Sequence, residues 1–232
     1  MLDAPKPAAD GRSTRWESHR ARRRAEVIEA AVAAIEADGL DVGVKQIAGR
    51  VGVPRSVVYR HFKDRADLDE QIRQHVVELL MVRLAPTLRP GGTVMEAIRR
   101  AIGTYLEWVE RHPRLHAFLG KGMSRAAGAS PAVVGTKTAI AVDVGHLFAA
   151  VLRRHRVADD LASSIAFGLV GFVDATVNHW LADRDRTLTA AELAALLSRS
   201  IWHVLDGNLR ALGIELDPDT PVADLLDAST NG

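Results

Sequence analysis

The 232-residue chain contains no cysteine. Without thiols it can form no disulfide and has no thiolate chemistry, which suits a reducing cytoplasm. No uninterrupted apolar run reaches the length of about 18 residues that a membrane-spanning helix needs. The polar, arginine-rich N-terminus also lacks the hydrophobic region of a signal peptide. We therefore expect a cytoplasmic protein that does not enter a membrane.

Signatures of catalysis are also missing. No serine stands in a G-x-S-x-G motif, and no glycine-rich loop could cradle a phosphate. His112 and His116 are four residues apart, as two metal ligands on one helix face would be, but no third ligand or H-E-x-x-H motif accompanies them. We interpret them as a helix-start and a partly buried histidine. The sequence thus predicts no enzyme, no metal site and no cofactor.

Charge is distributed unevenly, although the net charge is only +1. Residues 1–63 contain 12 basic and 8 acidic residues, whereas residues 64–232 contain 18 basic and 21 acidic residues. This pattern indicates that only the front of the chain meets a polyanion such as DNA.

Apolar residues recur at helical spacing, and no alternating strand pattern occurs, so we predict an all-α fold. Two S/T-x-x-E capping boxes, at Thr93 and Thr189, mark helix starts. The expected helices, whose ends are set by glycine, proline and capping residues, are 20–37, 44–51, 54–60, 64–85, 93–111, 113–119, 130–155, 160–181 and 189–212.

These helices divide into an N-terminal three-helix DNA-binding domain, residues 20–63, and a C-terminal helical ligand-binding and dimerisation domain, residues 64–213. Residues 1–19 have two prolines and no periodicity, so we expect a disordered basic arm. Its arginines either solvate the arm or neutralise phosphates, and the neighbouring helices favour phosphates. Residues 214–232 are expected to form a mobile acidic tail with a turn near 222–226.

The stretch 44–68 has the layout of a helix-turn-helix. Ile47, Ala48 and Val51 give a short first helix an apolar face, and Gly52 ends that helix. A second helix begins near Pro54 and places Arg55 and its neighbours outward, toward a major groove.

The same stretch resembles the TetR (tetracycline-repressor-like) family. Its residues reproduce the pattern I-A-x-x-x-G-V-x-x-x-x-x-Y-x-H-F-x-x-[KR]-x-x-L from Ile47 to Leu68. The likeness covers about a third of the chain, and beyond it only the helical layout agrees. Gly43 stands where the family often has a capping threonine, and Pro54 and Val57 replace a common serine and threonine. Base contacts therefore cannot be copied from another member.

Position and resemblance together predict a surface that binds a double-stranded DNA operator. Arg55 and Ser56 are the candidates for base edges, since arginine commonly pairs with guanine. The resemblance implies phosphate contacts for Tyr59 and Lys63, and Arg65 would add another. The complete predicted surface is Lys45, Arg55, Ser56, Tyr59, Arg60, His61, Lys63 and Arg65.

Small residues spaced along one helix, namely Ser164, Gly168, Gly171 and Ala175, predict close helix packing. This packing lies either within the chain or, as the resemblance favours, in a homodimer with Leu197, Ile201 and Leu205 of the last helix.

Large apolar residues on the middle helices form a core, and some are expected to line a ligand pocket. Asp174 and Asn178 interrupt an apolar helix, so they either bond across the dimer or orient a ligand. The candidates are Leu84, Tyr105, Trp108, Phe118, Met123, Phe148, Phe167, Phe172, Asp174 and Asn178.

The sequence therefore predicts a homodimeric transcriptional repressor that a small lipophilic effector releases from a palindromic operator. The alternative is an architectural DNA-binding or protein-interaction module without an effector.

Overall fold

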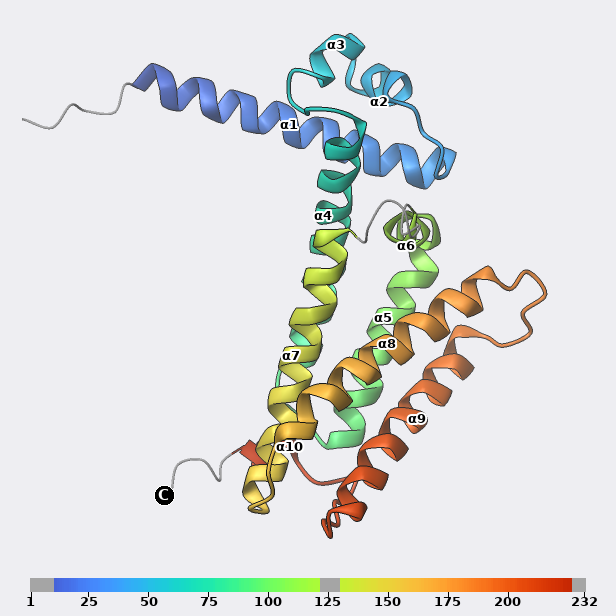
Figure 1. Ribbon diagram of the computed structural model, residues 1–232. Helices are drawn as coiled ribbons and strands as arrows, with labels where there is room; N and C mark the ends of the chain where they lie inside the picture. Colours follow the sequence, from blue (N-terminus) through green and yellow to red (C-terminus); the bar gives the residue numbers. More distant parts are fainter. Residues whose placement is uncertain (1–10, 122–129, 227–232) are drawn as a thin grey trace, which may run out of the picture. The chain divides into compact units, whose positions relative to one another are not determined.

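The computed structural model describes residues 11–121 and 130–226, with side chains from Ser18 onward. The described residues are helical, with one isolated β-bridge and no strand, which confirms the all-α prediction (Figure 1). The chain divides into two compact units, residues 1–75 and residues 76–232, and each is described below by itself.

The first unit contains α1 (Gly11–Asp38), α2 (Val44–Val51), α3 (Arg55–Val58) and the first half of α4 (Arg65–Leu84). α1 packs on α2, and α2 packs on α3. Their apolar faces meet in a small core, which supplies the burial that such short helices need to be stable. This core comprises Val27, Ala31, Ala34, Ile35, Ile47, Ala48, Val58, Phe62, Leu68 and Ile72.

The turn between α2 and α3 depends on Gly52. Its φ of 71° lies in the left-handed region, which glycine adopts without a Cβ penalty. The N–H of Val53 then donates to the carbonyl of Ala48 at 3.0 Å, closing the end of α2. α4 begins with a reciprocal cap, because the Asp67 N–H donates to Asp64 Oδ1 at 2.8 Å and the Lys63 N–H donates to Asp67 Oδ2 at 2.9 Å. This cap accounts for the predicted start of the helix at residue 64.

α1 begins at Gly11 rather than at the predicted Arg20. The expectation that residues 11–19 lack regular structure is therefore wrong; residues 1–10 lie outside the described part. Residues 12–38 contain neither glycine nor proline, so nothing in the sequence stops the helix from extending backward. The absence of apolar periodicity in this stretch indicated an unpacked segment and did not exclude a helix.

The second unit contains the rest of α4, the 3₁₀ turn η1 (Ala85–Leu88), α5 (Val94–Arg111), α6 (Pro113–Gly120), α7 (Pro131–Arg154), α8 (Asp160–Ala182), α9 (Ala190–Ala211) and α10 (Val222–Leu226). Both predicted capping boxes are present. The Thr93 hydroxyl accepts from the Glu96 N–H, and the Thr189 hydroxyl accepts from the Glu192 N–H.

α7 packs along α8, and α5 packs along α9. At the α7–α8 crossing stands Gly145, where a Cβ would lie 3.6 Å from the Cβ of Ala166 and 3.8 Å from the carbonyl of Ala162. A larger side chain would push the helices apart, so this glycine sets their close approach. The prediction of small-residue packing did not include Gly145.

The C-terminal segment is not a mobile tail over the residues described. Ile214, Val222 and Leu225 are buried, and Val222 and Leu225 belong to α10. The N–H groups of Val94 and Met95 donate to the carbonyls of Thr220 and Pro218, at 3.1 and 3.0 Å. Acidic composition indicated exposure, but three apolar residues are enough to bury one face of this segment.

α7 and α8 are long and apolar enough to cross a membrane by length and composition alone, which corrects the expectation that no segment is. The expectation counted uninterrupted apolar runs, whereas an average over 18 residues tolerates charges such as Lys137, Asp143 and Asp174. Such a criterion is also met by core helices of water-soluble proteins. Lys137 of α7 and Asp174 of α8, both half-buried, form an ion pair at 2.7 Å.

Candidate DNA-binding surface and ligand cavity

The helix-turn-helix of the first unit presents a basic, exposed face. Five of the eight predicted contact residues are exposed: Lys45, Arg55, Ser56, Arg60 and Lys63. Tyr59, His61 and Arg65 are half-buried. The pattern that placed Val58 and Phe62 in the core, at 0% and 2% exposure, therefore also placed the polar side chains outward.

Arg55 and Tyr59 are coupled across one turn of chain. The Arg55 guanidinium lies 5.3 Å from the centre of the Tyr59 ring, and it donates a hydrogen bond to the Tyr59 hydroxyl at 3.2 Å. A guanidinium held over an aromatic face loses less freedom when it binds a base or phosphate. The structure thus brings together the residue predicted to read bases and one predicted to contact phosphate.

His61 lies in a positive environment within the first unit. Burial lowers its pKa most, and the charges of Arg20, Arg60, Arg23 and Arg24 lower it further. His61 is therefore uncharged at neutral pH and adds no positive charge of its own. The arginines identify an electropositive region formed by α1 together with the end of the helix-turn-helix. Arg20, Arg23 and Arg24 were not in the predicted surface, although their clustering in the sequence was the available signal.

Arg65 makes two bonds within the first unit. Its Nε donates to Asp69 Oδ1 at 2.8 Å, and a terminal nitrogen donates to the carbonyl of Val42 at 2.9 Å. It therefore fastens the start of α4 to the segment before α2, a role that the sequence did not indicate. Its predicted phosphate contact would have to use its remaining donors.

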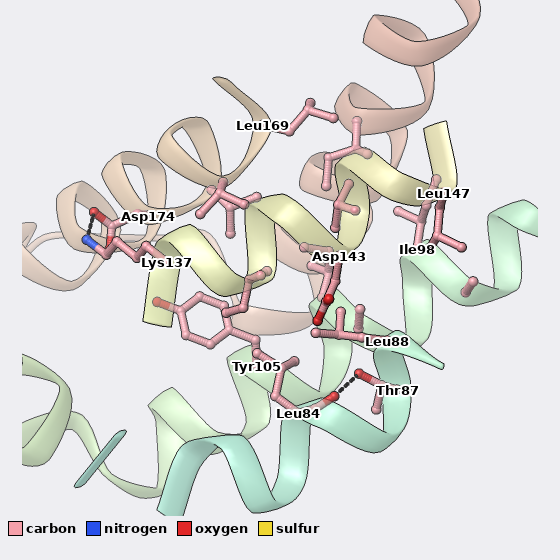
Figure 2. A pocket seen from close by; sticks show the side chains of 18 of the residues that line it. Leu84, Thr87, Leu88, Ile98, Tyr105, Lys137, Asp143, Leu147, Leu169 and Asp174 are labelled. Atoms are coloured by element: carbon pink, nitrogen blue, oxygen red, sulfur yellow. Dashed lines mark hydrogen bonds and ion pairs between the residues drawn. The ribbon is translucent and has the colours of Figure 1, made fainter. Parts of the chain in front are cut away.

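The second unit contains a partly open apolar cavity of about 310 Å³ (Figure 2). This size falls at the lower end of the range for small-molecule sites. The walls come from α4, η1, α5, α6, α7, α8, α9 and the C-terminal segment. Most lining side chains are aliphatic, so the favourable contribution to binding would come mainly from burial of apolar ligand surface.

One end of the cavity is polar. The Tyr105 hydroxyl and His116 Nε2 lie 2.8 Å apart, and the Lys137–Asp174 ion pair lies at the same end, as Figure 2 shows for Tyr105, Lys137 and Asp174. Burial raises the pKa of Tyr105 above its ordinary value, with Asp174 adding to the effect. His116, predicted to be partly buried, is only 5% exposed.

Of the predicted pocket residues, five line this cavity: Leu84, Tyr105, Phe148, Asp174 and Asn178. The other four described candidates do not. Trp108 and Phe118 are buried in the core away from it, and Phe167 and Phe172 of α8 are exposed at 45% and 41%. Met123 lies outside the described residues. Side-chain size and apolarity predict which residues are candidates for a pocket, but only the packing of the helices decides which of them line the cavity.

The cavity also includes residues that the sequence gave no reason to single out. Ile98, Lys137, Asp143 and Leu147 contribute to its walls, and Leu216 comes from the C-terminal segment. Lys137 and Asp143 lie six residues apart on α7 within an otherwise apolar helix, which is the signal that could have identified them.

The predicted dimer residues separate into two groups. Ser164, Gly168, Gly171 and Ala175 of α8 are exposed within the protomer. Leu197 and Ile201 of α9 are buried, at 0% and 9%, and Ile201 and Leu205 line the cavity. Leu197 and Ile201 are therefore packed within the protomer rather than presented to a second copy, whereas Leu205 is half-buried and its place in the interface stays a prediction. The exposed apolar residues of α9 are Leu196 and Val204.

A basic helix-turn-helix unit, followed along the chain by a helical unit with an apolar cavity, is the architecture of a helix-turn-helix transcriptional regulator. Comparison with known proteins agrees. The sequence model of the bacterial regulatory proteins of the tetR family matches residues 27–72. An uncharacterized HTH-type transcriptional regulator of Mycobacterium tuberculosis is 25% identical over 209 residues, which cover 88% of this chain and 86% of that protein.

Solved structures share the fold. A tetR-family regulator from Streptomyces coelicolor superposes with a TM-score of 0.64 at 20% identity, over 90% of this chain and 96% of that one. FadR of Bacillus subtilis, determined in complex with stearoyl-CoA, superposes with a TM-score of 0.61 at 17% identity, over 78% of this chain and 97% of FadR. Residues 27–72 thus match the DNA-binding segment of the TetR family, and the chain as a whole has the fold of TetR-like transcriptional regulators.

Proposed function

We propose that this regulator is a homodimeric repressor that a small lipophilic effector releases from a pseudo-palindromic operator. The observation that carries the proposal is the apolar cavity of about 310 Å³ in the second unit. A protein that acted only as an architectural module would gain stability by filling such a space. The bound stearoyl-CoA of FadR supports a lipophilic effector by analogy.

Dimerisation is proposed through α8 and α9. The face of α8 that carries Gly168 and Gly171 also exposes Phe167 and Phe172, and α9 exposes Leu196 and Val204. α8 and α9 follow one another along the chain, so pairing both helices with those of a second copy would make a four-helix interface with two-fold symmetry. Two helix-turn-helix units related in this way would occupy successive major grooves in the cytoplasm, where operator DNA resides.

Native mass spectrometry of the purified protein would test the proposal. We expect a dimer that carries a lipophilic molecule of defined mass, which organic extraction removes. The extracted protein should bind an operator selected from random duplexes more tightly, and adding back the extracted molecule should release it. Operator affinity that is unchanged by the molecule would eliminate effector control and favour the architectural alternative.

A further inference from the structure

The polar end of the cavity contains a tyrosine–histidine pair whose hydrogen-bonding capacity is not fully used within the described part of the chain. Tyr105 and His116 bond to each other through the hydroxyl and Nε2. His116 Nδ1 is buried and has no hydrogen-bond partner within the described part of the chain. Both residues line the cavity.

The protonation states of Tyr105 and His116 determine which of their hydrogen-bonding groups remain unused. Burial raises the pKa of Tyr105, so its hydroxyl stays protonated. Burial also lowers the pKa of His116, an effect that Lys137 reinforces and Asp174 opposes, so the imidazole is neutral. The pair therefore holds two donor hydrogens, one on each side chain, and only one is used in their mutual bond.

The tautomer with hydrogen on Nε2 fits the surroundings better. If Tyr105 donated to Nε2, the buried Nδ1–H would be a donor without an acceptor, which is the costlier defect. If Nε2–H donates to the Tyr105 oxygen, Nδ1 is left only as an unused acceptor. The hydroxyl hydrogen is then free to be donated into the cavity. Tyr105 as a residue is half-buried, whereas His116 is 5% exposed.

Charge at this end is already balanced. Lys137 and Asp174 pair with each other at 2.7 Å, so neither is available to a charged ligand without breaking the pair. Arg89 and Asp143, which are both exposed, also line the cavity, and their opposite charges leave no net charge among its arginine, lysine and aspartate residues. A charged head group at the polar end would be buried without a counter-charge of its own, which is costly.

We infer that the effector has an apolar body and, at one end, an uncharged hydrogen-bond acceptor such as a ketone or ester carbonyl, which accepts from the Tyr105 hydroxyl. This inference rests on the proposed function, because it assigns the chemistry of the effector to the same cavity. It distinguishes a neutral carbonyl compound from the free carboxylate or ammonium of a similar chain.

The test uses four probes with nine-carbon chains: nonan-2-one, nonane, nonanoate and nonylammonium. Each is titrated against the full-length protein loaded with the uncharged dye Nile red, and displacement of the dye gives its affinity. We expect nonan-2-one to bind at least tenfold more tightly than either charged probe. Nonanoate or nonylammonium as the tightest ligand would overturn the inference.

Single substitutions then test whether the Tyr105 hydroxyl donates the hydrogen bond to the ligand. Tyr105→Phe should weaken nonan-2-one roughly five- to tenfold, the value of one hydrogen bond, and leave nonane unchanged. Tyr59→Phe alters the chain's other tyrosine, in the first unit, and should change neither affinity. Retained Nile red binding would show that the Tyr105→Phe cavity is intact.

The outcomes separate the two proposals. If all four probes bind with similar affinity, or if Tyr105→Phe leaves nonan-2-one unaffected, the neutral-acceptor inference fails while the effector cavity stands. If neither Nile red nor any probe binds, the effector cavity fails and the inference fails with it.

Discussion

At the scale of the residue, one side chain of the helix-turn-helix restricts the conformations of another. Arg55 lies four residues before Tyr59, and its guanidinium both stacks on the ring and donates to the hydroxyl. The arrangement restricts an arginine that would otherwise sample many rotamers, so less entropy is lost when it meets a base edge. The backbone N–H of Lys63 donates to Asp67 at the start of α4. Its side chain is exposed and suits a contact with a DNA phosphate through charge alone.

These two residues should therefore respond differently to truncation. Arg55→Ala is expected to cost about 1–3 kcal/mol on the selected operator and to relax preference at one base position. Lys63→Ala should weaken operator and random DNA equally and should lower the slope of log affinity against log salt by about one. Fluorescence anisotropy at several salt concentrations measures both. Equal losses on specific and random DNA for Arg55→Ala would show that Arg55 does not read bases.

At the scale of the element, α8 has one face that is buried within the protomer and one that is exposed. Ala162, Ala166 and Leu169 are buried, and Gly145 of α7 approaches closely at the crossing with α8. The other face combines small residues with exposed Phe167 and Phe172, which is unusual for a surface that stays in water. Among the described residues α8 packs extensively only along α7, so its exposed apolar face is expected to have a partner outside the protomer.

Gly171→Leu tests whether a second copy is the other partner. No atom lies within 4 Å of where its Cβ would be, so the protomer can accept leucine without a clash. We expect the new side chain to obstruct the α8 crossing in the dimer and shift the protein toward monomer in sedimentation velocity.

Gly135→Leu is the matched control, because Gly135 is also an exposed helical glycine, on α7, with open space around it. That variant should remain dimeric. A Gly171→Leu protein that sediments like the parent would show that dimerisation uses another surface.

At the scale of the whole molecule, α4 is the element shared by both units. It runs without interruption from Arg65 to Leu84, and the division between the units falls inside it, at residues 75 and 76. Leu68 and Ile72 are buried in the first unit, whereas Leu80 and Leu84 line the cavity of the second. A rigid helix that belongs to both can transmit a displacement at the cavity to the DNA-binding unit.

Softening α4 at the division should uncouple the units while both stay folded. Gln74→Gly/His75→Gly lowers local helix stability by about 2 kcal/mol relative to Gln74→Ala/His75→Ala, which removes the same side chains. We expect the alanine variant to release operator on addition of effector as the parent does. The glycine variant should bind effector and dimerise normally, bind operator more weakly, and no longer respond.

Operator titrations with and without the co-purified molecule would measure this coupling, which is typically about 1–3 kcal/mol in such systems. An unchanged response in the glycine variant would mean that coupling does not depend on the stiffness of α4.

The sequence by itself determined the helices, their caps and the resemblance to the TetR family. These features depend on residues close together in the chain, such as Thr93 with Glu96, Asp64 with Asp67, and the run from Ile47 to Leu68. Local hydrogen bonds and periodicity suffice to specify them. The exposed face of the helix-turn-helix followed for the same reason, because burying Val58 and Phe62 directs their polar neighbours outward.

Tertiary structure alone decided which apolar side chains face a cavity, a neighbouring helix or water. Phe148 lines the cavity, Phe118 is core and Phe167 is exposed, although all three are phenylalanines on helices of the second unit. Leu197 and Leu196 are adjacent in sequence, yet only the second is exposed. Tyr105 and His116 meet because α5 and α6 turn back at His112, which brings residues from two helices to one end of the cavity. Such placements depend on how whole helices cross, and helix crossings are set by contacts between residues far apart in the chain.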